Sequence, residues 1–396
     1  MYTYFKNRFS PSDELNVLSA FQPMYITLSV FRLMPYSLKF PKDLEGAIVI
    51  HKSIYFNSLC LVSMILLLYS SCFLHVQYLL AAAENNTEVL MTKTNYLIEL
   101  FGYLVFSTVT YFCAVKNRFT YVEILNAILS SSNKLLNHRL DLVRGIHVQV
   151  KIVIGSLCLL LAAQLTVNFT RHETVWRITL VTLTFILPQM IQFATISFFY
   201  VLVLMVVGIL RNINGQLINF VSRRRFNATE ITKMETKTVD FRLIETVFVK
   251  VLQTKREINK AFQAPILATA IQCFHSLISE TYIIYHGVSI DNSLTAHDIF
   301  NCFTWIGYQL LKICMITRTG ILLKAQIAKI GRSLHNIPTG KKEVRLYLEI
   351  QHFSTLIIYQ NTELTVYDYL PIDATLMFNI VTSAVMYLII LMQFEN

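Results

Sequence analysis

Seven long apolar runs constrain this chain more than any other feature of its sequence. A membrane-spanning helix needs about 20 predominantly apolar residues, and each run is at least that long. Hydrophobic residues make up 54% of the chain and charged residues only 15%, whereas soluble domains carry about 25% charged residues. We therefore predict an all-α, polytopic membrane protein with seven transmembrane helices at residues 54–80, 95–115, 150–170, 177–208, 263–287, 298–323 and 370–394.

The fourth run is longer than a bilayer requires and contains Pro188. A single long helix would either tilt or project beyond the membrane, with a kink at the proline. Two short helices are the main alternative. No turn signal divides the run, so a single helix is favoured.

The basic residues between the runs predict the orientation. Segments on one side contain 28 Lys and Arg residues, and those on the other side contain two. Because cytoplasmic loops carry the Lys and Arg excess, we predict a cytoplasmic N-terminus and an extracellular C-terminus. The basic segments are 1–52, 116–149, 209–262 and 324–369.

The basic segments include two amphipathic stretches, 229–262 and 344–369, in which apolar residues recur at helical intervals. A helix with one apolar face must cover that face. We predict that the fifth and seventh helices continue below the membrane into a cytosolic bundle; a helix lying on the lipid surface is the alternative. The expected organisation is a cytoplasmic segment 1–53, six transmembrane helices with their connections in 54–323, cytosolic helices in 324–369 and a last transmembrane helix in 370–396.

Motifs for catalysis are missing from the sequence. It contains no GxxxxGK[ST], GxGxxG, HExxH or GxSxG motif, and its histidines and cysteines show no ligand-like spacing. We therefore predict no catalytic residue, metal or cofactor. We also predict no nucleic-acid partner, because membrane orientation explains the net charge of +10. Asn85 and Asn168 begin N-x-Thr sequons on the predicted outer side, and we predict that both are glycosylated.

Ionisable residues inside membrane spans are expected to be functional. Glu99, Glu280 and Lys312 lie within the second, fifth and sixth runs, and Glu280 and Lys312 are expected to pair or to face a cavity. Arg318 lies nearer a helix end, from which its side chain can reach the lipid headgroups.

Aromatic and hydrogen-bonding residues gather in the outer half of the predicted bundle. Small-molecule pockets combine apolar and aromatic walls with a few polar groups, although aromatic residues also form belts at membrane interfaces. The candidate ligand-binding residues are Tyr96, Gln164, Gln189, Gln192, Tyr282, Tyr285, His286, Trp305 and Tyr308.

The last run places polar and mid-sized apolar residues on one helical face. At 100° per residue, Asn379, Ser383, Met386, Ile390 and Gln393 fall on that face. Such a stripe suits a pore lining with a hydrophobic constriction. A seam of small residues between packed helices is the alternative.

The residues from Tyr387 to Phe394, Tyr-Leu-Ile-Ile-Leu-Met-Gln-Phe, resemble the C-terminal signature of the insect gustatory receptor family. The preceding segment Tyr369-Leu370-Pro371-Ile372-Asp373 resembles the start of the same helix in that family. The signature threonine is Met386 here. Leu388 stands where sugar receptors often carry an acidic residue, so a bitter or other non-sugar ligand is favoured.

The resemblance implies a ligand-gated, non-selective cation channel in the plasma membrane that is opened by a small organic tastant. It implies a tetramer with the last helix of each subunit around the pore, held by a cytosolic anchor, and it adds Tyr387 and Phe394 to the pore and gate residues. An obligate subunit of a heteromeric channel remains an alternative. A G-protein-coupled receptor is disfavoured because the predicted N-terminus is cytoplasmic, and a transporter because no repeat is evident.

Overall fold

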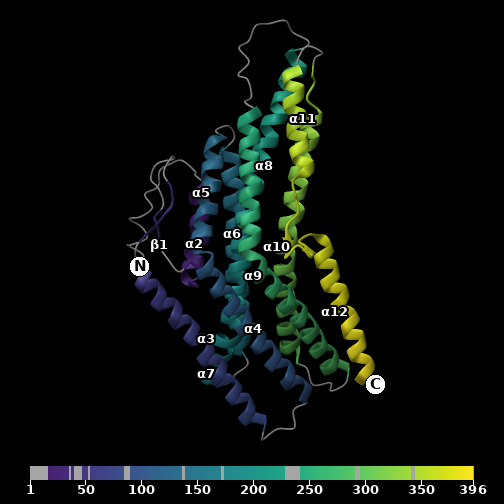
Figure 1. Cartoon of the computed structure of the whole chain (residues 1–396). Coiled ribbons are helices and arrows are strands. Elements are labelled where there is room, and N and C mark those ends of the chain that lie inside the picture. The colour runs from purple at the N-terminus through teal and green to yellow at the C-terminus, as the bar shows by residue number, and fades with distance from the viewer. Residues whose placement is uncertain are drawn as a thin grey trace.

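Long helices that run side by side build almost the whole computed structural model of this chain (Figure 1). Among the residues that the structure describes, seven helices are long and apolar enough to cross a membrane, which confirms the predicted number. The described residues are 17–34, 37–39, 47–51, 54–83, 90–135, 139–170, 174–227, 241–289, 295–339 and 344–395.

The helices follow the predicted runs but are mostly longer than a bilayer requires. Two short antiparallel hairpins interrupt them, β1 (Ser37–Lys39) with β2 (Val49–His51) and β3 (Thr365–Val366) with β4 (Leu370–Pro371). The helices are α2 (Val17–Val30), α3 (Ile54–Ala83), α4 (Leu90–Lys116), α5 (Arg118–Lys134), α6 (Arg139–Thr170), α7 (Val175–Val181), the π-helix η1 (Thr182–Ile186), α8 (Leu187–Asn227), α9 (Phe241–Ser289), α10 (Ala296–His335), α11 (Val344–Tyr359) and α12 (Ala374–Glu395).

Helix α8 lies at the centre of the bundle. It continues α7 and η1 without a break, so the fourth run is one helix, as predicted, and it is longer than a bilayer requires. Nearly all of its apolar span is buried, whereas the span in α12 is almost wholly exposed in the single chain. A helix that is apolar on every side is stable only when neighbours surround it.

Three helices extend far past the membrane at one end of the molecule. The 49 residues of α9 make a helix about 73 Å long, against about 30 Å for the hydrocarbon core. Its extension packs with α5, α11 and the ends of α8 and α10, and we name this assembly the extension bundle. The described residues of segments 116–149 and 209–262 are therefore largely helical rather than loops. The predicted continuation of the fifth helix is confirmed from Phe241 onward, and residues 229–240 of that prediction lie outside the described residues.

Aromatic side chains pack together where the extension bundle joins the membrane-spanning parts of the helices. Phe198 of α8 lies 5.3 Å from Phe262 of α9 and 5.2 Å from Tyr121 of α5, measured between ring centroids. Phe21 of α2 packs on the same ring at 6.0 Å. The N-terminal helix α2 is thus held against the bundle by buried aromatic contacts.

The prediction for the seventh helix is wrong in one respect. Helix α12 begins at Ala374 rather than 370, and the β3–β4 hairpin separates it from α11, so the two are not one continuous helix. Tyr367 and Asp368 have φ values of 51° and 61°, which a helix does not allow. Pro371 further restricts Leu370 to an extended conformation.

Candidate functional site

Lys312 of α10 is the centre of a buried polar cluster near the middle of the bundle. Its ammonium donates to Gln189 Oε1 of α8 at 2.9 Å and also to Gln192 Oε1. The same nitrogen lies 5.0 Å from the centre of the Tyr308 ring, and the Tyr308 hydroxyl donates to the backbone oxygen of Gln189 at 3.1 Å. Lys312, Gln192 and Gln189 are at most 1% exposed.

The same cluster reaches a carboxylate on α4. Gln189 Nε2 donates to the Tyr103 hydroxyl, and Tyr103 donates to Glu99 Oε1 at 3.1 Å. Ser276 of α9 donates to the same oxygen at 2.8 Å. An ammonium and a carboxylate in a low-dielectric interior are therefore joined through hydrogen bonds, which offset part of the cost of burying both charges. We call these seven residues, from Lys312 to Glu99, the polar core.

The π-helix η1 positions the α8 residues of the polar core. The Leu187 N–H donates to Thr182 O, a turn one residue wider than in an α-helix. The next residue, Pro188, has no N–H and its ring crowds the preceding turn, so a widened turn accommodates it. Gln189 and Gln192 follow at a spacing of three residues and point to one face. Such π segments are frequent at functional sites.

Four buried glutamine amides have nitrogen atoms without a hydrogen-bond partner among the described residues. The nitrogens belong to Gln192, Gln272, Gln309 and Gln164. Gln309 Oε1 accepts from the Cys273 thiol at 3.4 Å, one residue from Gln272. Because buried donors are normally paired, these amides can bind oxygen atoms of a ligand or of water.

An aromatic cluster lies beside the polar core. The Phe185 ring of η1 makes edge contacts with Tyr103, Tyr96 and His75 at 5.9, 6.4 and 5.5 Å between centroids. Trp305 packs against this cluster and lies 6.5 Å from Tyr308. The site therefore combines aromatic walls with directed polar groups, the composition expected of a small-molecule pocket.

The predicted ligand-binding residues separate into two groups. Gln189, Gln192, Tyr308, Trp305 and Tyr96 come together at the polar core or its aromatic wall. The others lie elsewhere: Tyr282 packs on His286 at 5.8 Å toward the end of α9, Tyr285 is half-buried nearby, and Gln164 is buried on α6.

The predicted pore residues on α12 whose side chains the structure describes are all exposed in the single chain. Leu376 and Ala384 are buried against α9 and α10. The predicted stripe lies outside this contact and comprises Asn379, Ser383, Met386, Tyr387, Ile390 and Gln393. The side chain of Phe394 lies outside the described residues.

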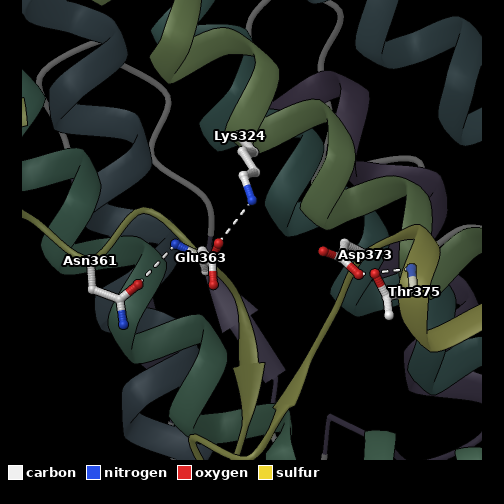
Figure 2. Close-up of polar contacts among 5 residues, drawn as sticks. All are labelled: Lys324, Asn361, Glu363, Asp373 and Thr375. Carbon is white, nitrogen blue, oxygen red and sulfur yellow. Dashed lines mark hydrogen bonds and ion pairs between the residues drawn. The ribbon is translucent and has the colours of Figure 1, made fainter.

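The junction between α11 and α12 is attached to α10 (Figure 2). Lys324 forms an ion pair with Glu363 at 2.8 Å, and Asp373 Oδ1 accepts from the Thr375 N–H at 2.9 Å, which caps α12. Gly320 of α10 lies so close to the backbone of Ile372 that a Cβ atom there would overlap the carbonyl group. Helix α10 is therefore in direct contact with the segment that leads into α12.

Comparisons with known proteins agree with this architecture. The model of the 7tm chemosensory receptor family matches residues 21–396. The chain belongs to this family. Among curated protein sequences, none matches the chain significantly. Chemosensory receptors are membrane receptors rather than enzymes, and this one is a multi-pass protein of the plasma membrane.

Solved structures with the same fold include an insect olfactory receptor. The structure of OR5 from Machilis hrabei superposes with a TM-score of 0.72 at 12% identity, covering 94% of this receptor and 97% of OR5. OR5 in complex with eugenol superposes with a TM-score of 0.71 at 13% identity, covering 95% and 99%. At this identity the likeness concerns the fold.

Several residues of the site were not predicted from the sequence, and others lie in surroundings that were not anticipated from it. Ser276, Gln272 and Gln309 were not predicted, although their spacing from Glu280 and Lys312 on polar helix faces was a signal. Arg318 is exposed, consistent with a side chain that reaches the headgroups. The Asn168 sequon remains a prediction, but its amide nitrogen is buried; Asn85 lies outside the described residues.

Proposed function

We propose that this receptor is a ligand-gated, non-selective cation channel opened by a small organic tastant, bitter or otherwise non-sugar. The proposal rests on the exposed face of α12. One of its faces packs on α9 and α10, while Asn379, Ser383 and Met386 are exposed. A helix with this mixed stripe suits the lining of a pore shared with other subunits. Four copies would enclose it, with cations as the permeating species.

In this proposal the extension bundle is cytosolic and α12 ends outside the cell. The excess of Lys and Arg in the segments that form the bundle supports this orientation. The extension bundle would hold the subunits together through its helix α11. The polar core would then lie within the membrane, reached from the outer side.

The ligand would bind at the polar core and its aromatic wall. OR5 is a fold neighbour that binds eugenol, a small organic molecule, which supports a ligand of similar size here. Tighter binding to a state with shifted α9 and α10 would favour that state. The attachment of α10 at Gly320 and Lys324 would transmit the shift to α12, where Ile390, Gln393 and Phe394 would leave the axis and let the constriction hydrate.

The test combines current recording with cysteine accessibility. The receptor is expressed alone in a heterologous cell, in a Cys158→Ser, Cys314→Ser background that removes the two exposed thiols. A panel of bitter compounds and sugars is applied with G-protein signalling blocked. We expect a ligand-evoked cation current that a cationic thiol reagent blocks after Asn379→Cys or Ser383→Cys.

The matched control is Ala384→Cys, which lies on the same helix but is only 8% exposed, and it should resist the reagent. Equal modification of both faces would contradict a pore lining on the Asn379 face. If the receptor reaches the surface without any current, co-expression with related receptors distinguishes an obligate heteromeric subunit, which gains current, from a protein that is not a channel. Gln393→Ala is expected to alter gating.

A further inference from the structure

A hollow of about 300 Å³ lies between α3 and α4, away from the polar core. Its walls come from two candidate spans, Ser58–Leu80 and Thr94–Lys116. We call it the α3–α4 groove. The described residues that line it are mostly apolar, and none of them is charged: Leu61, Ile65, Leu68, Tyr69, Ser107, Thr108, Tyr111, Phe112 and Val115.

The α3–α4 groove opens toward the lipid of the bilayer. Phe112 and Tyr69 at its edge are 66% and 44% exposed, and both belong to membrane spans. Helix α3 lies on the side of the molecule opposite α12 (Figure 1). Subunits that meet around α12 would therefore leave the groove facing lipid.

One polar atom in the groove has no hydrogen bond within the described residues. The Ser107 hydroxyl is buried, with the residue 2% exposed, and is unpartnered. The other hydroxyls of the wall are used: Tyr69 and Thr108 bond each other at 2.8 Å, and Tyr111 donates to Phe31 O at 3.0 Å. A buried hydroxyl without a partner is costly, so a ligand hydroxyl that bonds Ser107 would stabilise the occupied groove.

The inner end of the groove touches the element that shapes the polar core. A second, small hollow shares Leu68 and Ser107 with it and is lined on its far side by Thr184 and Pro188. Its volume of about 10 Å³ is close to the minimum for one water molecule. The head of a ligand would therefore stop at Ser107, while its body stays in the larger hollow.

We propose that the α3–α4 groove binds a lipophilic molecule that is dissolved in the bilayer and carries one hydroxyl group, with that hydroxyl bonded to Ser107. The apolar walls select the body of the molecule. The absence of charged residues from the lining disfavours anionic and cationic heads, because an unpaired charge is expensive there. This binding does not depend on whether the receptor is a channel.

The test is photolabelling of the purified full-length receptor in lipid nanodiscs with a decanol that carries a diazirine and an alkyne. Labelled peptides are mapped by mass spectrometry, with 1-decanol and decane as competitors. We expect adducts on the peptides that contain Leu61 to Tyr69 and Ser107 to Val115. Excess 1-decanol should displace them, and decane should do so far less well.

Two variants and a matched control separate the groove from bulk lipid. Ile65→Trp fills the groove and should abolish the label, whereas Leu66→Trp, on the exposed side of α3 at 63% exposure, should leave it unchanged. Ser107→Ala should weaken competition by 1-decanol about fivefold, the effect of one lost hydrogen bond. The proposal is overturned by labelling spread evenly over the spans, by persistence in Ile65→Trp, or by equal competition from decane.

Discussion

At the scale of single residues, the polar core joins two buried charges that do not touch directly. Lys312 binds Gln189, Gln189 binds Tyr103, and Tyr103 binds Glu99. Removing one charged partner from such an arrangement leaves the other without compensation, which typically costs about 3 to 5 kcal/mol. Removing both leaves no uncompensated charge in the interior.

A double-mutant cycle tests this linkage. We expect Lys312→Met and Glu99→Gln each to lower the thermal midpoint of the purified receptor clearly, and the double variant to lose less than the sum, with a coupling of about 0.5 to 3 kcal/mol. Arg318→Met, at an exposed position of the same helix, is the control and should change stability by less than about 0.5 kcal/mol. Additive losses would mean that the two charges act independently.

At the scale of elements, the contact between α10 and the β3–β4 hairpin depends on a missing side chain. At Gly320, any Cβ would overlap the backbone of Ile372, which cannot rotate away. At Gly331, also in α10, a Cβ would meet nothing within 4 Å. Gly320 is thus in tight contact with the Ile372 backbone, whereas Gly331 of the same helix faces open space.

We expect Gly320→Ala to lower the stability of the receptor by about 1 to 3 kcal/mol through overpacking, and to detach the base of α12. Gly331→Ala should instead be neutral or stabilising by up to about 1 kcal/mol, because alanine favours a helix interior. Thermal midpoints and the protease sensitivity of the hairpin report the two effects. Equal behaviour of both variants would show that the hairpin does not press on α10.

Secondary structure could be predicted where the length of an uninterrupted apolar run determined it. The run around Pro188 was predicted as one helix because no turn signal divides it, and the structure agrees. The break before α12 was not predicted, although Pro371 was visible in the sequence; the turn at Tyr367 and Asp368 is known only from the structure. Helical periodicity in 344–369 outweighed those local signals in our interpretation.

At the scale of the whole molecule, α11 carries apolar residues on two faces. Phe353 and Ile350 are buried in the extension bundle, but the opposite face leaves large side chains open to solvent. Exposed apolar patches of this kind mark association surfaces. The exposed residues are Val344, Tyr347, Leu348, Ile358 and Tyr359.

If α11 joins the subunits of the proposed tetramer, Leu348→Asp should shift the detergent-purified receptor toward monomer, because burying a carboxylate in an apolar interface is unfavourable. The control Arg345→Asp changes an exposed position of α11 outside this apolar set and should leave the assembly intact. Mass photometry measures both. A tetramer that survives Leu348→Asp would place the contacts elsewhere.

The sequence by itself determined the seven spans, the single long fourth helix and the family signature near the C-terminus, because these depend on local composition and on length relative to a bilayer. The tertiary structure alone decided which polar residues meet. Glu99 and Lys312 lie on different helices more than 200 positions apart. Their link through Gln189 and Tyr103 depends on helix rotation and on the π-turn before Pro188, and periodicity within one helix carries no information about the partner helix.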